Sequence, residues 1–139
     1  MIYLDSAAIV KLIRPETETA ALHAWLTSQQ DKVLVTSTLV EIEVPRALRR
    51  TDPGRLVAVP TLLAKLNRIP MDETVRATAA AYADPQLRTP DAIHLASAQT
   101  LLLEGLPLTA LVTYDKRLLT AAAEVGLATA APGAEGPKY

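Results

Sequence analysis

The chain has 139 residues, half of them apolar and 21% charged, and its formal net charge is -1. This length suits a single domain, and the even balance of charges excludes a disordered acidic tail or a histone-like basic arm. The absence of cysteine excludes disulfide frameworks, zinc–thiolate sites and cysteine nucleophiles.

The first residues, MIYLDSAAIVKLIRPE, place an acid within a short apolar stretch. They have neither the basic start nor the small-residue cleavage site of a signal peptide. No apolar run in the chain approaches the ~18 residues that a membrane span needs. We therefore expect a soluble, cytoplasmic protein.

Strands and helices are expected to alternate along the chain. Short β-branched and apolar runs predict the strands, and apolar residues at helical spacing between capping or turn residues predict the helices. In chain order, we expect a strand at 1–4, helices at 6–13 and 16–29, a strand at 33–36, helices from Ser37 or Thr38 to 50 and from 52–54 to 67, a strand at 68–71, helices at 72–83 and 89–104, a strand at 111–114, a helix at 116–125 and a strand at 127–131. Thr89 is the expected N-cap of its helix, with Pro90 at the first helical position.

This alternation predicts βαβ units and a three-layer α/β fold with a parallel sheet of about five short strands. We expect one domain at residues 1–131. Residues 132–139, with the sequence PGAEGPKY, show no pattern and are expected to form a loose tail.

Four acidic residues fall at or near the carboxyl ends of the strands, the edge at which open α/β sheets bind ligands. Asp5 follows the first strand, Asp115 follows the fourth, Asp91 opens a helix, and Glu43 lies in the helix after the second strand. Crowded carboxylates cannot all ionise without a cation between them, and oxygen ligands without cysteine select Mg²⁺ or Mn²⁺. The Asp residues also have a simpler explanation, because Asp is favoured as an N-cap and in the first helical turn. Both interpretations stay open at this point.

Four segments carry a resemblance to a known family: MIYLDSAAIVKL, VTSTLVEIEVPRALRR, LRTPDAIHLASA and LVTYDKRLLTAAAEVGL. In this order they cover nearly the whole chain, which resembles the PIN-domain ribonucleases and most closely the VapC toxins of toxin–antitoxin pairs. The resemblance implies a parallel sheet in the strand order 3-2-1-4-5. It also implies an endoribonuclease toxin that forms a homodimer and is blocked by a small VapB-type antitoxin.

Carried over onto this sequence, the family's four catalytic acids are Asp5, Glu43, Asp91 and Asp115. In such proteins the acids hold one or two Mg²⁺ or Mn²⁺ ions that hydrolyse RNA phosphodiester bonds. We expect Asp5 and Asp91 to be the direct metal ligands, because Mg²⁺ keeps several waters and takes one or two carboxylates. Glu43 and Asp115 are expected to complete the site, through water or in a second layer around the metal.

Glu43 has a competitor two residues earlier, at Glu41. Two residues on a helix are separated by about 200°, so only one of the two can face the site. Glu43 shares a helix face with Leu39 and Ala47, which predicts that it points inward while Glu41 is solvated. Pro45 lies in the same helix, where proline costs about 3 kcal/mol and can introduce a kink that would redirect Glu43.

Further polar residues near these motifs each have two interpretations. His94, three residues after Asp91, either reaches the site or is satisfied within the helix packing. Ser6 and Thr113 either support the acids or are an ordinary cap and strand residue. The nearby basic residues either contact RNA phosphates or are solvated surface charges; they are Arg46, Arg49, Arg50, Lys116 and Arg117.

Two other functions compete with the ribonuclease. A PIN-like fold that has lost catalysis would serve only as a binding module. A nuclease of the same fold acting on DNA or flap structures is disfavoured, because such relatives generally carry further acids and larger insertions. The five glycines form neither G-x-G nor G-x-x-x-x-G-K, which disfavours the common nucleotide-binding enzymes.

Overall fold

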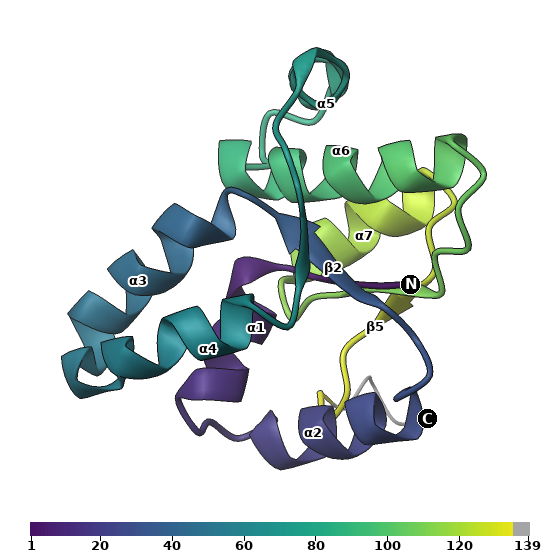
Figure 1. Cartoon of the computed structure of the whole chain (residues 1–139). Helices are drawn as coiled ribbons and strands as arrows, with labels where there is room; N and C mark the ends of the chain where they lie inside the picture. Colours follow the sequence, from purple (N-terminus) through teal and green to yellow (C-terminus); the bar gives the residue numbers. More distant parts are fainter. Residues whose placement is uncertain (135–139) are drawn as a thin grey trace.

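The computed structural model describes residues 1–134. Its centre is a five-stranded parallel sheet in the order β3-β2-β1-β4-β5. Helices cover both faces of this sheet (Figure 1), which confirms the predicted three-layer α/β fold and the strand order. The strands are β1 (Ile2–Leu4), β2 (Leu34–Ser37), β3 (Asn67–Ile69), β4 (Ala110–Val112) and β5 (Thr129–Ala130).

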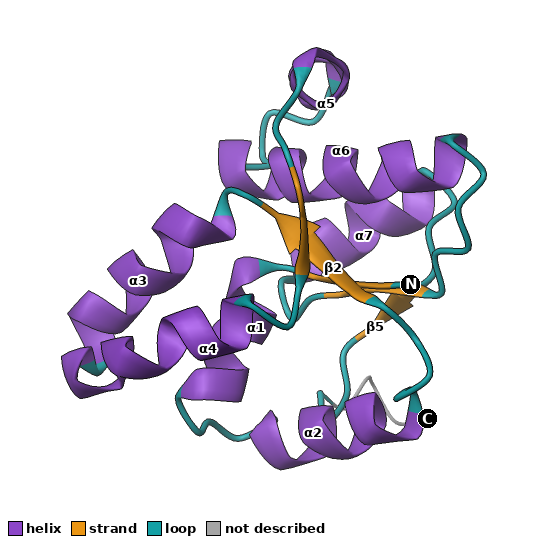
Figure 2. Cartoon of the chain, in the orientation of Figure 1, coloured by secondary structure: helices purple, strands orange, loops and turns teal. Residues whose placement is uncertain are grey.

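One or more helices connect each strand to the next, and Figure 2 shows these helices in purple and the strands in orange. They are α1 (Ser6–Ile13), α2 (Thr19–Ser28), α3 (Val40–Thr51), the 3₁₀ helix η1 (Pro53–Ala58), α4 (Val59–Leu63), α5 (Glu73–Ala81), α6 (Thr89–Leu103) and α7 (Lys116–Glu124). Within the described residues, no helix is long and apolar enough to cross a membrane.

The sheet separates two hydrophobic cores. Successive side chains of β1 point to opposite faces, so Ile2 and Leu4 join the core under α1, α2, α3 and α4, whereas Tyr3 joins the core under α6 and α7. All three residues have no solvent exposure. A strand buried on both faces is typical of the middle of a parallel sheet, and β1 does lie there, between β2 and β4.

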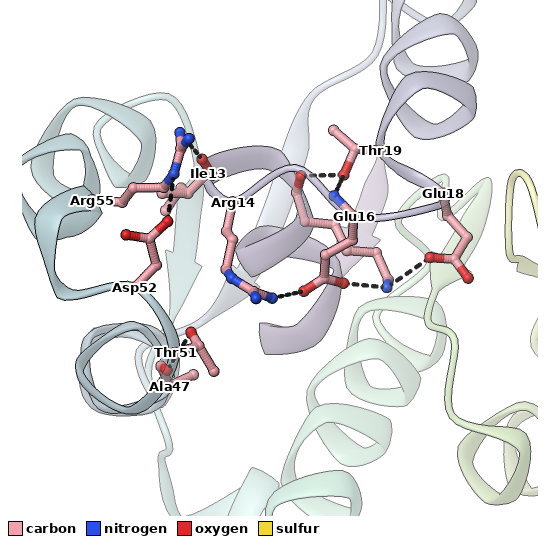
Figure 3. Close-up of polar contacts among 10 residues, drawn as sticks. Ile13, Arg14, Glu16, Glu18, Thr19, Ala47, Thr51, Asp52 and Arg55 are labelled. Carbon is pink, nitrogen blue, oxygen red and sulfur yellow. Dashed lines mark hydrogen bonds and ion pairs between the residues drawn. The ribbon is translucent and has the colours of Figure 1, made fainter.

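The single helix expected up to residue 67 was a wrong prediction. The chain forms η1 and then α4, which ends at Leu63. Pro60 stands in the first turn of α4, where its missing N–H costs nothing, and this favours a new helix start over continuation. Arg55 stabilises the 3₁₀ segment by pairing with Asp52 at 2.8 Å and donating to the carbonyl oxygen of Ile13 at 3.2 Å (Figure 3).

Several expected helix starts are shifted by one to three residues. Arg88, not Thr89, is the N-cap of α6, and Leu39, not Ser37 or Thr38, is the N-cap of α3. The Ser37 hydroxyl instead accepts a hydrogen bond from the Leu39 N–H within the preceding turn.

The second helix begins at Thr19 rather than at residue 16. Glu16 and Glu18 are drawn into ion pairs with Lys11 of α1, at 2.6 and 3.0 Å. Figure 3 shows both glutamates in the link between α1 and α2, with Arg14 beside Glu16. The acids therefore hold the link instead of extending the helix.

The segment after β5 packs beside the core that contains Ile2 and Leu4. The Tyr114 hydroxyl donates to the carbonyl oxygen of Pro132 at 2.8 Å. Gly133 has a positive φ, and a Cβ atom there would lie 2.8 Å from that of Ala21, so only glycine fits this approach. These residues open the segment expected to be a loose tail, whose remaining part at 135–139 lies outside the described residues.

Candidate active site

The four acids identified in the sequence line one pocket of about 350 Å³ at the carboxyl edge of the sheet. Asp5 lies between β1 and α1, and Asp115 lies between β4 and α7. Since β1 and β4 are neighbours in register, these two junctions are adjacent. Asp91 reaches the pocket from the first turn of α6, and Glu43 reaches it from α3. Four separate elements thus bring their carboxylates together.

Asp5 and Asp115 are also helix N-caps. The Asp5 carboxylate accepts from the Ala8 N–H at 2.8 Å, and that of Asp115 accepts from the Leu118 N–H at 2.9 Å. The capping interpretation is therefore confirmed for both residues. Because a carboxylate offers about four lone-pair sites, one capping bond leaves acceptor capacity for a ligand in the pocket.

Two substitutions of Asp5 separate its capping role from its charge. Asn retains an N-capping oxygen and Ala does not, so we expect the D5A protein to unfold with a free energy about 1 kcal/mol lower than that of D5N. Chemical denaturation of the two variants measures this difference. The matched control is Asp72, which caps α5 through the Val75 N–H outside the pocket and should give a similar Asn–Ala difference. Equal stability of D5A and D5N would contradict the capping role.

The pocket disfavours negative charge. Burial raises the pKa of Asp91 to about 6, and the charges of Asp115 and Asp5 add to this shift. Burial also raises the pKa of Asp5, against the opposing effects of His94 and the Thr113 hydroxyl. Negative charge on these carboxylates is therefore disfavoured in the pocket, and a bound cation would offset that cost.

The donor set fits a hard divalent cation. Within residues 1–134, no three acidic or histidine side chains stand close enough together to form a ready-made metal cage. Mg²⁺ does not require one, because it usually keeps several waters and takes one or two carboxylates directly. Four carboxylates around one pocket, two of them with raised pKa values, satisfy that requirement.

Glu43 faces the pocket and Glu41 does not, as expected from their positions on α3. Glu43 accepts from the Ser6 hydroxyl at 2.6 Å and contacts Nε2 of His94 at 3.0 Å. Burial raises the pKa of Glu43, but these hydrogen bonds outweigh it and the net pKa is lowered. Glu41 is exposed and pairs with Arg68 at 3.3 Å. Helix α3 continues unbroken through Pro45.

His94 is satisfied within the helix packing, as one of its two interpretations predicted, and its buried ring also reaches the pocket. Ser6 also lines the pocket, whereas the buried Thr113 accepts a hydrogen bond from the Asp115 N–H at 3.1 Å and so fixes the turn that carries this acid.

Two arginines line the pocket, Arg50 from the end of α3 and Arg88 from the residue before α6. Arg50 was among the sequence candidates, but Arg88 was missed. Its only signal was its place immediately before the Thr89–Pro90–Asp91 helix start. The remaining basic candidates lie elsewhere: Arg46 and Arg49 are exposed on α3, and Lys116 and Arg117 line a separate depression beside α7.

Comparisons with known proteins agree with this geometry. Residues 2–124 match the PIN domain family. The chain is 53% identical over 133 residues to Ribonuclease VapC35 from two strains of Mycobacterium tuberculosis, covering 96% of this chain and 98% of the relative.

Two solved structures share the fold. One is Mycobacterium tuberculosis VapC20, described as a sarcin–ricin loop cleaving toxin, with a TM-score of 0.69 at 17% identity, covering 91% of this chain and 96% of VapC20. The other is a toxin–antitoxin complex from Klebsiella pneumoniae, with a TM-score of 0.60 at 18% identity, covering 84% of this chain and 88% of the matched chain. With the match over residues 2–124 and the identity to VapC35, the chain belongs to the PIN-domain family and, within it, to the VapC proteins.

Proposed function

We propose that this protein is a metal-dependent endoribonuclease and the toxin of a toxin–antitoxin pair. The observation that carries the proposal is the convergence of four carboxylates from four elements on one pocket. The 53% identity of this chain to proteins named Ribonuclease VapC35 supports RNA as the substrate.

We assign the metal to Asp5 and Asp91, whose pKa values are both raised in the metal-free pocket. A bound Mg²⁺ or Mn²⁺ lowers the pKa of a water molecule and offsets charge that develops on the phosphate. Asp115 is fixed by its capping bond and Glu43 by Ser6 and His94. Both are therefore suited to orient water at the site rather than to move during the reaction.

Arg50 and Arg88 are the groups we assign to the RNA backbone. They line the same pocket as the acids but come from different elements. Guanidinium groups form strong, charge-assisted hydrogen bonds with phosphate oxygens. The two arginines would therefore offset the repulsion between the RNA phosphates and the carboxylates of the pocket.

Replacing Arg88 with Gln is expected to raise KM for RNA about fivefold and to leave kcat within about twofold. Because one phosphate contact is lost, the slope of log K for RNA binding against log salt concentration should fall by about 1 in magnitude. Initial rates over a range of RNA and salt concentrations provide these values. Arg46→Gln is the control, because Arg46 is exposed on α3 and does not line the pocket. An R88Q protein with unchanged KM, or with the same change as R46Q, would contradict the assignment.

The partners follow from the same proposal. We assign residues 1–131 to one PIN domain and expect a homodimer held inactive by a VapB-type antitoxin. The match to a toxin–antitoxin complex from Klebsiella pneumoniae supports the fold on which this pairing rests. With RNA as the proposed substrate, we expect the protein to act in the cytoplasm.

The decisive experiment is cleavage of total cellular RNA by the purified protein freed of any antitoxin. Reactions with Mg²⁺, with EDTA and with the Asp91→Ala protein are run side by side. We expect discrete fragments that require both the metal and Asp91, and sequencing their ends identifies the target. Failure of a folded, metal-loaded protein to cleave any RNA would favour the binding module instead, and cleavage of DNA in a parallel reaction would favour the DNA nuclease.

A further inference from the structure

A buried chain of hydrogen bonds leads from the centre of the sheet to the wall of the pocket. Tyr3 of β1 is fully buried, and its hydroxyl oxygen lies 2.7 Å from Nδ1 of His94. Nε2 of the same ring lies 3.0 Å from Oε1 of Glu43 and 3.1 Å from Oγ of Ser6. Ser6 itself donates to Oε1 at 2.6 Å. One oxygen of Glu43 is therefore held from two different helices.

The chemistry of these groups indicates which of them donate and which accept along this series of hydrogen bonds. An ionised carboxylate only accepts hydrogen bonds, so the contact with Glu43 requires a proton on Nε2 of His94. A neutral imidazole with that proton has an acceptor at Nδ1, and the Tyr3 hydroxyl must then donate to it. Tyr3 lies in the sheet between Val35 of β2 and Leu111 of β4. Its ring packs edge-on against the His94 ring, with 5.7 Å between the two ring centroids. The Tyr3 hydroxyl therefore contacts Nδ1 from the core side, and the Glu43 carboxylate contacts Nε2 from the pocket side.

Glu43 depends on such support more than the aspartates at the strand ends. Asp5 and Asp115 are each fixed by a hydrogen bond from the helix that they cap. Glu43 has a longer side chain and lies inside α3, which has no side-chain cap at its start. Within the described residues, Ser6 and His94 supply its hydrogen bonds.

We propose that Tyr3 and His94 form a positioning pair for Glu43: Tyr3 selects the Nε2–H tautomer of His94, and His94 presents that proton to the Glu43 carboxylate. The inference rests on the proposed ribonuclease function for its purpose, but not for its geometry. Groups behind a metal site that orient its carboxylates commonly affect activity or metal affinity by about 10- to 100-fold.

The tautomer provides a test that needs no catalysis. The chain has two histidines, and His23 is exposed on α2, so nitrogen-15 NMR of the metal-free protein resolves few imidazole signals. We expect His94 to carry its proton on Nε2 in the wild-type protein and to show a mixture of tautomers in Tyr3→Phe, which removes only the hydroxyl. A wild-type protein with the proton on Nδ1, or an unchanged tautomer in Tyr3→Phe, would overturn the proposal.

A pair of substitutions at His94 tests the positioning itself. The Gln side chain keeps an N–H donor for Glu43, whereas Leu does not. We expect His94→Leu to lower kcat and Mn²⁺ affinity about tenfold, with KM for RNA within about twofold, and His94→Gln to recover most of the loss. Thr100→Val is the control, because the buried Thr100 hydroxyl donates to the Ser97 carbonyl on the same helix, away from the pocket.

Equal losses in the Gln and Leu proteins, or none in the Leu protein, would overturn the positioning role. The two proposals fail separately. If the wild-type protein cleaves no RNA, the ribonuclease proposal falls while the tautomer and the Mn²⁺ affinities still decide the role of Tyr3 and His94. If RNA is cleaved and the His94 proton is on Nδ1, only the positioning pair falls.

Discussion

Replacing Asp91 with Asn is expected to reduce RNA cleavage by at least about 100-fold and to raise the melting temperature of the metal-free protein by about 3 °C. The loss of activity follows from the removal of a proposed metal ligand, since a neutral amide is a far weaker partner for Mg²⁺ than a carboxylate. Single-turnover cleavage of the target RNA measures the first effect, and thermal unfolding in EDTA measures the second.

The gain in stability has a separate physical cause. The pKa of Asp91 is raised to about 6 by burial and by the charges of Asp115 and Asp5, so its ionised form destabilises the fold at neutral pH. Asp91 is half-buried, and after allowance for solvent screening the effect amounts to about 1 kcal/mol. In a chain of this size, that free energy corresponds to roughly 3 °C.

Asp72→Asn is the matched control, because Asp72 is an exposed N-cap outside the pocket. We expect this change to leave both cleavage and melting temperature nearly unaltered. A D91N protein that is inactive and also less stable would indicate a damaged fold. A D91N protein that cleaves RNA at the wild-type rate would remove Asp91 from the site altogether.

Loss of activity combined with gain of stability is characteristic of residues placed for function rather than for folding. Asp5 and Asp115 complicate this distinction, because each caps a helix and lines the pocket at the same time. An Asp placed between a strand and the next helix therefore has two roles: it caps the helix and brings a carboxylate to the edge of the sheet. Capping alone therefore neither supports nor excludes a functional role for such residues.

The sheet-edge acids were predictable because local patterns determine their positions. Asp5 and Asp115 follow short apolar strands, and the regular alternation of elements predicts a parallel sheet whose strand ends share one edge. The inward direction of Glu43 was predictable from helical spacing alone. None of these inferences required knowledge of a contact between distant residues.

Two of the features that sequence missed, the placement of Arg88 and the pairing of Tyr3 with His94, depend on such distant contacts. The one local signal at Arg88, its place before a helix start, does not show that the loop before α6 brings it to the pocket wall. Tyr3 reads as an ordinary strand residue, and only the packing of α6 on the sheet places it against His94, 91 positions away. The change from η1 to α4 instead has a local cause in Pro60, in the first turn of α4, which the prediction of one helix up to residue 67 did not use.

Removal of the divalent metal is expected to abolish RNA cleavage and to make the stability of the protein strongly dependent on pH. The pKa of Asp91 is raised from its ordinary value of 3.8 to about 6 in the folded protein, so between these pH values the folded state keeps a proton that the unfolded chain releases. Stability of the metal-free protein is therefore highest below pH 4 as far as this group is concerned, and is lost as pH rises from about 4 to 6. Burial shifts the pKa of Asp5 in the same direction, whereas the lowered pKa of Glu43 contributes stability in the opposite sense, above its unfolded value.

Added Mn²⁺ reverses this loss, because the ion binds the ionised carboxylates. At about 100 times its Kd, a ligand stabilises the folded state by about 2.7 kcal/mol, which corresponds to a rise of about 8 °C here. We expect that rise at pH 7.5 and a much smaller one at pH 5, where protons compete for Asp91. Thermal unfolding with Mn²⁺ and with EDTA at both pH values provides the comparison, and Asp91→Asn should remove most of the rise. A Mn²⁺-induced shift that is the same at both pH values, or that persists in D91N, would show that the ion binds elsewhere.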